Sequence, residues 1–354
     1  MNGFMLKIAS LFYGAAIKLR HLLFDMNILH SEKFDIPIIC VGNITVGGTG
    51  KTPTVEMLVS HYSEEYNVAV LSRGYGRITK GYRVVETTDN YRQVGDEPLQ
   101  IKRKFPNVKV VVCEKRVFAI QRIQEEFPEV NMIIMDDGFQ HRYVEPLINI
   151  IIVDANRPID KDHLLPYGQL RDTSDSLARA NYFIVTKCPQ DMKPLQMRLF
   201  RMDLVTKPSQ DIFFSSIAPA PSCSVFADTY KTVPIGSKVI AMSGIGDSDA
   251  FVRGLQSRYD VVARLDFEDH HSYRMNDLLL MQKSLAEYPD AVIMTTEKDA
   301  VKLANSSAIP QDMHVKIFYE PITMIFRGEG SKELFNKIDN DIKNKDNEKH
   351  IRGL

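Results

Sequence analysis

The sequence predicts an α/β protein with a mostly parallel sheet covered by helices on both faces, a smaller C-terminal α/β domain and an N-terminal amphipathic helix. Short apolar, β-branched runs such as residues 36–42 and 131–135 alternate with helical stretches along most of the chain. This alternation is typical of parallel strands joined by helices. A Pro- and Ser-rich stretch at 207–236 separates two series of such runs. We therefore expect two domains, which the length of 354 residues also favours.

The two series of apolar runs define the expected elements and boundaries. The strands expected in the first series are 36–42, 67–72, 108–112, 131–135, 148–155 and 181–187. Those of the second are 238–244, 259–267, 290–296 and 314–326, with a helix near 275–286. The expected boundaries are an N-terminal helix at 1–30, a larger α/β domain at 31–210, a linker at 211–236, a smaller α/β domain at 237–330 and a charged tail at 331–354.

Composition excludes several classes of protein. The net charge of −1 gives no overall basic field, so we expect no nucleic-acid partner. The four cysteines lie far apart and lack the spacing of a metal site. They are typical of buried thiols in a reducing compartment.

Residues 4–24 predict an amphipathic helix. The apolar side chains at helical spacing are Phe4, Ile8, Leu11, Phe12, Ala15, Leu19, Leu22 and Leu23. Lys7, Gly14, Lys18 and His21 fall on the opposite face, and the longest uncharged run is too short to span a bilayer. The apolar face could lie in a membrane interface or pack on the protein's own core, and the pattern alone supports both interpretations equally.

Residues 41–54, VGNITVGGTGKTPT, resemble the phosphate-binding loop G-x-x-x-x-G-K-[ST]. Thr45 stands where that motif has its first Gly. A strand, a Gly-rich turn and a helix N-terminus together form an anion site, because backbone N–H groups point at phosphate. This context predicts a P-loop-type fold. The expected nucleotide-binding residues are Thr45, Val46, Gly47, Gly48, Thr49, Gly50, Lys51 and Thr52.

Asp136 and Asp137 follow the apolar run 131–135 directly. Sites in α/β sheets form at the carboxyl ends of the strands, and a nucleotide site that uses Mg²⁺ needs a carboxylate there. We therefore expect Thr52, Asp136 and Asp137 at the metal. Capping of a helix is the alternative role for the two acids, and it is the weaker one.

Two further acidic segments are candidates for proton transfer. Asp96 lies in VGDEP at 94–98, where the pattern favours a solvated turn or helix cap and a general base is the alternative. The segment 266–273, DFEDHHSY, places Asp269 before His270 and His271, a group suited to handling a proton or a metal.

Three other segments carry motifs of lower specificity. Residues 295–303, TTEKDAVKL, are similar to a base-reading motif of nucleotide switches, and equally to a capped helix start. Several arginines follow expected strands at the carboxyl edge of the sheet, where the site is expected. They lie in residues 72–77, at Arg116 and in YGQLRD at 167–172. Arg116 and Arg171 are there suited to clamp phosphate, although a single Arg is more often a surface cation.

Together these segments resemble the tetraacyldisaccharide 4′-kinases of lipid A synthesis. The matching motifs are VGNITVGGTGKTP, SRGYGR, GDEP, DDGFQH, LLPYGQLRD, VTKC, SGIGD, DHHSY and TTEKDAVKL, within residues 4–303. Ser or Thr at the position of Thr45 is normal in that family. The set is specific, although none of its members is specific alone.

The resemblance implies an ATP-dependent kinase that phosphorylates the 4′-hydroxyl of a tetraacyldisaccharide 1-phosphate to give lipid IVA. By analogy Lys51 and Thr52 hold phosphates and Mg²⁺, and Asp136 and Asp137 lie at the metal. Asp96 is the expected base, paired with His270, although His271 stays open for that role. Arg116 and Arg171 are expected to stabilise phosphate charge or to hold the disaccharide.

The resemblance also implies a place in the cell. The acyl chains stay in a membrane, so the N-terminal helix is expected to bind its surface, at the cytoplasmic face of the inner membrane as a peripheral protein. One departure concerns Asp172, where the family has Glu. It is kept as a metal candidate that acts through a water, with a reach one methylene shorter.

Three other functions compete with the kinase. A nucleotide switch or metallochaperone GTPase would read guanine with residues 295–303. A soluble kinase or ligase for a small metabolite would leave the amphipathic helix unexplained. A non-enzymatic scaffold would leave the loop, the Asp pair and Asp96 without a role.

Overall fold

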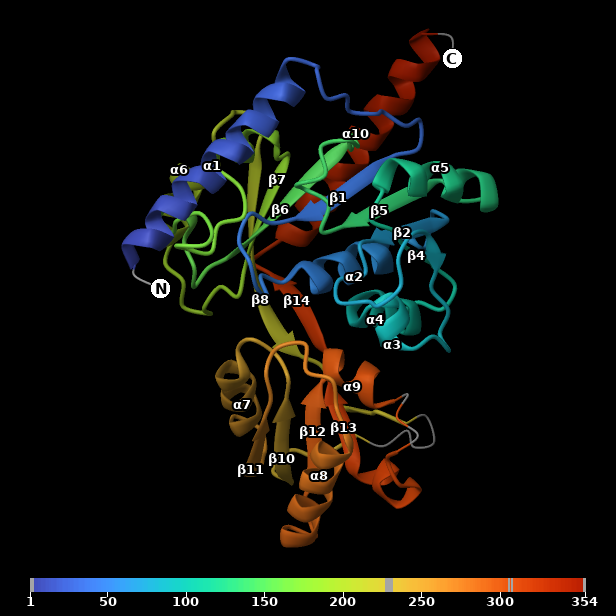
Figure 1. The fold of residues 1–354 in the computed structure, drawn as a ribbon, viewed down its shortest axis with the longest axis vertical. Coiled ribbons are helices and arrows are strands. Elements are labelled where there is room, and N and C mark those ends of the chain that lie inside the picture. The colour runs from blue at the N-terminus through green and yellow to red at the C-terminus, as the bar shows by residue number, and fades with distance from the viewer. Residues whose placement is uncertain (1–2, 227–231, 305, 307, 353–354) are drawn as a thin grey trace.

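The computed structural model describes residues 3–226, 232–304, 306 and 308–352, which form two lobes, each with its own sheet (Figure 1). The large sheet has nine strands in the order β14-β8-β7-β6-β1-β5-β2-β4-β3. They are β1 (Ile38–Gly42), β2 (Val68–Ser72), β3 (Arg83–Val84), β4 (Lys109–Val112), β5 (Met132–Asp136), β6 (Ile148–Asp154), β7 (Tyr182–Thr186), β8 (Asp211–Pro219) and β14 (Ile322–Phe326). All neighbours pair in parallel except the two edge strands β3 and β14. The expected parallel sheet is therefore confirmed.

Side chains alternate across the central strand β1, so both faces of the large sheet are buried. Ile39 and Val41 pack on one face with α2 (Lys51–Tyr62), α4 (Asp96–Lys104) and α10 (Gly330–Arg352). Ile38 and Cys40 pack on the other face with α5 (Arg116–Glu126). Such two-sided burial explains why the strands read as continuous apolar runs.

The small lobe has five strands in the order β11-β10-β12-β13-β9. They are β9 (Cys223–Ser224), β10 (Lys238–Ser243), β11 (Asp260–Asp266), β12 (Val292–Thr296) and β13 (Ile317–Glu320), and only β9 runs antiparallel. The helices of this lobe are α7 (Ser248–Gln256), α8 (Met275–Glu287) and α9 (Glu297–Leu303). The lobes touch where α9 meets α4, and Arg103 Nη1 donates to the Val301 carbonyl over 3.0 Å there.

The structure differs from the expected linker and C-terminal boundaries. Residues 211–219 of the expected linker form β8, and β14 returns from the small lobe to pair with it antiparallel. These two strands run between the lobes as a pair (Figure 1). The Pro- and Ser-rich composition concealed β8, although four consecutive residues from Ile212 are buried. The expected strand at 314–326 is two strands, β13 and β14, one in each sheet.

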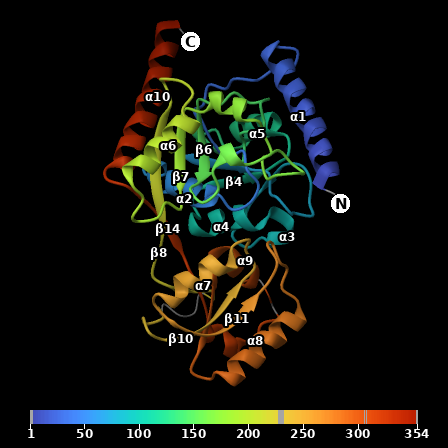
Figure 2. The same cartoon turned by 90° about the vertical axis from the view of Figure 1, so that its left-hand side faces the viewer.

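Two long helices lie on opposite sides of the large lobe (Figure 2). At the N-terminus, α1 (Gly3–Asp25) turns Phe4, Leu11 and Phe12 outward, each more than 70% exposed. At the other end, α10 buries Leu334, Ile338 and Ile342, so the first half of the expected charged tail is a packed helix. None of the helices among the described residues is long and apolar enough to cross a membrane.

Candidate active site

The Gly-rich loop connects β1 to α2, in the position expected from the sequence. Gly47 and Gly50 have φ of 94° and 98°, a region that favours glycine. A Cβ on Gly50 would lie 3.2 Å from Thr186, so the loop also needs the absence of a side chain there. Thr45 forms an antiparallel bridge with Leu170 and is buried. A residue in a bridge is extended, which explains why Thr is accepted where the common motif has Gly.

Cations that the sequence did not single out surround the loop. Lys187 Nζ donates to the Gly48 carbonyl over 2.6 Å and lies 2.8 Å from Asp154 Oδ2. Arg157 Nη1 donates to the Val46 carbonyl over 3.2 Å. Lys187 follows β7 in the segment VTKC, so its position after a parallel strand was the available signal.

The two acids at the end of β5, Asp136 and Asp137, have opposite electrostatic environments. Burial raises the pKa of Asp136 to about 7, and the charges of Glu97 and Asp137 add to this. The Asp136 Oδ2 accepts a hydrogen bond from Ser72 over 2.9 Å. Burial also acts on Asp137, but Lys51 and Arg171 outweigh it and lower that pKa to about 2. Arg171 binds both oxygens of Asp137, and Lys51 Nζ lies 3.7 Å from Oδ1.

The donor set fits a magnesium ion held mainly by water and phosphate. Asp136 Oδ1 is buried and has no hydrogen-bond partner among the described residues, so one carboxylate oxygen is available. Thr52 Oγ1 now donates to Glu97 Oε2 over 3.1 Å. In the described part of the chain no three His, Cys, Asp or Glu side chains gather as a metal site. Mg²⁺ usually takes one or two carboxylates and completes its shell with water and substrate phosphate.

Asp172 lies in different surroundings from the other metal candidates. Its Oδ1 is 2.7 Å from His21 Nε2 and also accepts from Thr173 N, while Oδ2 accepts from Arg179 over 3.4 Å. The Asp172 side chain is 2% exposed. The contact with His21 connects Asp172 to α1. The sequence could not indicate this contact because the two residues are 151 positions apart.

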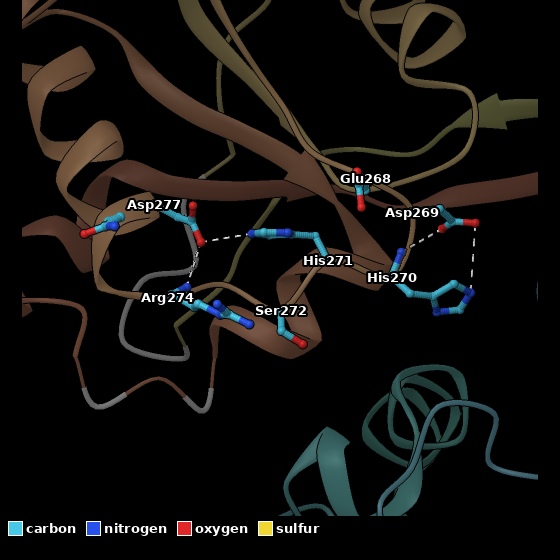
Figure 3. A pocket seen from close by; sticks show the side chains of 8 residues that line it. Glu268, Asp269, His270, His271, Ser272, Arg274 and Asp277 are labelled. Carbon is cyan, nitrogen blue, oxygen red and sulfur yellow. Dashed lines mark hydrogen bonds and ion pairs between the residues drawn. The ribbon is translucent and has the colours of Figure 1, made fainter.

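Asp96 and His270 meet where the two lobes touch. Asp96 is the first residue of α4, and its Oδ2 lies 3.0 Å from Nδ1 of His270, which comes from the small lobe. His271 pairs with Asp277 instead, over 2.9 Å. The two rings point in opposite directions along the rim of a pocket of about 460 Å³ (Figure 3). Of the two histidines that the sequence left open, His270 is therefore the one beside Asp96.

The environment of Asp96 makes it an ionised carboxylate. Burial would raise its pKa, but the hydrogen bond from His270 and the charges of Lys298 and Lys302 outweigh it, so the pKa is lowered. Lys298 and Lys302 lie 3.9 and 4.0 Å from Asp96 Oδ2. Both belong to the segment TTEKDAVKL, whose role the sequence left open.

The same segment is a capped helix start in the structure. Thr296 caps α9 by accepting from Asp299 N, and Asp299 is fully buried. Its carboxylate accepts from Gly244 N over 2.8 Å and from Lys302 over 3.0 Å. A carboxylate enclosed in this way is not available to read a guanine base, which removes the main support for a GTP switch.

Arg116 and Arg171 differ in how fully they are bonded. Arg116 is 2% exposed and donates to the Cys113 carbonyl, but its Nε and Nη2 have no partner among the described residues. Burial lowers its pKa although Asp136 and Asp137 act against this. Arg171 is occupied by Asp137 and by Asn43. The structure thus brings Arg116 and Arg171 to the two acids after β5.

Backbone geometry also distinguishes this region. Four residues other than glycine have positive φ in the described part of the chain, and three of them are Asp137, Lys187 and His270. Their φ values are 50°, 55° and 59°. Residues held in such conformations concentrate at functional sites.

Comparison with known proteins identifies the family. The family model described as tetraacyldisaccharide-1-P 4′-kinase matches residues 3–343. The chain belongs to the tetraacyldisaccharide 4′-kinase family. It is an enzyme, a kinase of that family.

Relatives in this kinase family match over nearly their whole length. The tetraacyldisaccharide 4′-kinase of Porphyromonas gingivalis is 40% identical over 327 residues, which cover 90% of this chain and 91% of the relative. That of Phocaeicola vulgatus is 37% identical over 350 residues, 95% of each chain. The crystal structure of LpxK from Aquifex aeolicus in complex with ATP matches with a TM-score of 0.74 and 26% identity, covering 98% of this chain and 99% of that one. The fold expected from the sequence is confirmed.

Proposed function

We propose that this kinase transfers the γ-phosphate of ATP to the 4′-hydroxyl of a tetraacyldisaccharide 1-phosphate, giving lipid IVA. Membership of the family supports the reaction class. The observation that carries the proposal is the pair of Asp96 and His270, joined between the lobes. A phosphate-binding loop and a residue that accepts the proton of the substrate hydroxyl are recurring parts of kinases.

The loop and the acids after β5 are proposed to hold ATP and Mg²⁺. Residues 45–52 would surround the phosphates, and Lys51 would leave Asp137 to reach the β- and γ-phosphates. Thr52 and Asp136 would ligate Mg²⁺, with Asp137 orienting its water. The ion neutralises charge on the transferring phosphoryl group. The contacts of Asp172 with His21 and Arg179 favour a structural role, so we leave it out of the metal site.

Asp96 is proposed as the general base. It is ionised and buried, and its hydrogen bond with His270 fixes its side chain. It would accept the proton of the 4′-hydroxyl while that oxygen attacks the γ-phosphorus. Arg116, with two unpaired nitrogens, and Arg171 would stabilise phosphate charge.

We further propose that α1 binds the cytoplasmic face of the inner membrane as a peripheral anchor. Its outward side chains include Phe4, Leu11, Phe12 and Leu19, all more than half exposed. An apolar helix face parallel to a bilayer enters the interface, and a substrate with four acyl chains stays in the same layer. The disaccharide head could then reach the site without leaving the membrane.

The test is transfer of radiolabelled phosphate from ATP to a tetraacyldisaccharide 1-phosphate in detergent micelles. We expect lipid product from the wild type, and a loss of kcat of about 10²–10⁴-fold in Asp96→Ala, the usual contribution of a general base. Lys51→Ala should lose activity to a similar extent. Lys332→Ala changes an exposed lysine of α10 and should leave the rate unchanged.

Two outcomes would contradict the proposal. Hydrolysis of ATP or GTP without any phosphorylated lipid would overturn the kinase activity on this substrate. Full activity of Asp96→Ala would not affect the proposed substrate, but it would exclude Asp96 as the general base.

A further inference from the structure

Lys298 is the central cation of the contact between the lobes. It lies in the first turn of α9, and its ammonium reaches groups from both lobes. Its Nζ is 3.1 Å from His270 Nε2, 3.4 Å from Asp269 Oδ1, 3.7 Å from Glu97 Oε1 and 3.9 Å from Asp96 Oδ2. The side chain is 18% exposed, so bulk water screens these contacts little.

The contact with His270 fixes the direction of a hydrogen bond. An ammonium group has three N–H donors and no acceptor, so Nε2 of His270 must accept from Lys298. A neutral imidazole that accepts at Nε2 carries its proton on Nδ1. That atom lies 3.0 Å from Asp96 Oδ2 and therefore donates to the carboxylate.

The other charged groups around His270 do not reverse this assignment. Asp269 Oδ2 lies 4.0 Å from His270 Nε2, beyond hydrogen-bond distance, while Lys298 is closer. Tyr75 packs against the ring with centroids 5.3 Å apart. Burial would lower the pKa of Lys298, but Asp96, Glu97 and Asp269 outweigh it and raise the pKa, which keeps the ammonium charged.

A second lysine supports the same carboxylate from deeper in the lobe. Lys302 Nζ lies 4.0 Å from Asp96 Oδ2 and 3.0 Å from Asp299, and its side chain is 1% exposed. Asp299 already neutralises Lys302, and the hydrogen bond of Lys302 goes to Asp299 rather than to His270. Lys298 is therefore the group that can determine which nitrogen of the His270 ring carries the proton.

We propose that Lys298 is a positioning residue that holds His270 in the Nδ1–H tautomer, so that His270 donates to Asp96 and keeps that carboxylate oriented. The inference rests on the proposed role of Asp96 as the base. Because Lys298 and His270 belong to the small lobe and Asp96 to the large one, the hydrogen-bonded chain forms only when the lobes are in contact. Lys298 thus links the contact between the lobes to the orientation of the Asp96 carboxylate.

The tautomer can be read directly by ¹⁵N NMR of protein labelled in histidine, with the His270 signals assigned from a His270→Gln spectrum. At pH 7.5 we expect a protonated Nδ1 and an unprotonated Nε2 in the wild type. In Lys298→Met the donor is lost, and we expect a mixture of tautomers. Lys298→Arg keeps a donor and should restore the wild-type tautomer at least in part. Lys332→Met, which changes an exposed lysine in the first turn of α10, is the matched control.

Kinetics give a second readout. In Lys298→Met we expect kcat to fall about 10–100-fold, a part of what a general base contributes, with the KM for ATP within about twofold. The small change in KM follows because the contacts of Lys298 go to His270, Asp269, Glu97 and Asp96, which all lie outside the phosphate-binding loop.

The two readouts separate the possible failures. An Nε2–H tautomer in the wild type, or an unchanged tautomer in Lys298→Met, would overturn the inference even if kcat falls, because the role would then be structural only. The spectra need no substrate. A wild type with the expected tautomer but without lipid kinase activity would overturn the proposed function and leave the hydrogen-bond direction established.

Discussion

The helices α1 and α10 are both 23 residues long and flank the same lobe, yet they present opposite faces to it. The inner face of α10 is apolar, with Leu334, Ile338 and Ile342 packed on the core of the large sheet. The inner face of α1 combines the buried Gly14 and Phe24 with polar contacts. His21 contacts Asp172, and Arg20 donates to the Gln140 carbonyl over 2.9 Å.

This difference separates two uses of an amphipathic helix. The apolar face of α10 is buried against the protein's own core, so the helix contributes to the stability of the fold. Most large apolar side chains of α1 are left outside, while polar contacts and the buried Phe24 hold the helix on the lobe. Hydrogen bonds and ion pairs give position with modest net stability, whereas apolar burial gives stability. The comparison predicts that changes in the two helices will affect different properties.

The largest effect on folding is expected in α10. Ile338→Ala removes a fully buried side chain and should lower the free energy of unfolding by about 2–5 kcal/mol. Urea denaturation followed by circular dichroism measures this change. Leu11→Ala in α1 is the matched control, because that side chain is 75% exposed and its truncation should cost less than about 0.5 kcal/mol. Equal losses in both variants would remove the distinction between the helices.

The next effect concerns membrane binding by α1. Leu11→Ser with Phe12→Ser removes two side chains that are 75% and 74% exposed. If each contributes about 1.5–3 kcal/mol when buried in lipid, the pair should weaken binding at least a hundredfold. Co-sedimentation with vesicles that contain anionic lipid measures this affinity, with the unfolding free energy as the control for fold. Unchanged binding would show that α1 is not the anchor.

The sequence predicted the sheet, the Gly-rich loop after β1 and the acids at the end of β5, because these depend on local patterns. Strand runs carry their own periodicity, and the loop and the acids each follow such a strand directly. The amphipathic pattern of α1 was also predictable. Which way its apolar face turns was not, since that depends on partners such as Asp172 far along the chain.

Other features depend on contacts that no local pattern encodes. The return of β14 to the large sheet follows from pairing with β8 across more than a hundred residues. The choice between His270 and His271 depends on the side from which Asp96 approaches, and the role of Lys298 on the contact between α4 and α9. Adjacent residues of similar chemistry were therefore distinguishable only in three dimensions.

The smallest expected effect is a change in stability with pH that arises from His141. His141 lies on the α1 side of the large lobe, where burial lowers its pKa to about 4 and the charges of Arg116, Arg73 and Arg20 add to this. The unfolded chain binds a proton near pH 6.5, so between pH 6.5 and 4 it holds more protons than the folded state at this residue. Stability from His141 therefore decreases as pH falls, by about 1 kcal/mol at pH 5.5.

The variant His141→Gln isolates this contribution. Asp136 and Glu297 act in the opposite direction, since their pKa values are raised to about 7 and the folded state binds their protons more tightly. The change in the wild-type unfolding free energy with pH is the net result of these opposing effects. Comparison with the variant separates the contribution of His141 from the other two. Between pH 7.5 and 5.5, urea denaturation should show about 1 kcal/mol less loss, or more gain, in His141→Gln than in the wild type. Parallel pH profiles would mean that burial and the neighbouring arginines impose no such cost on His141.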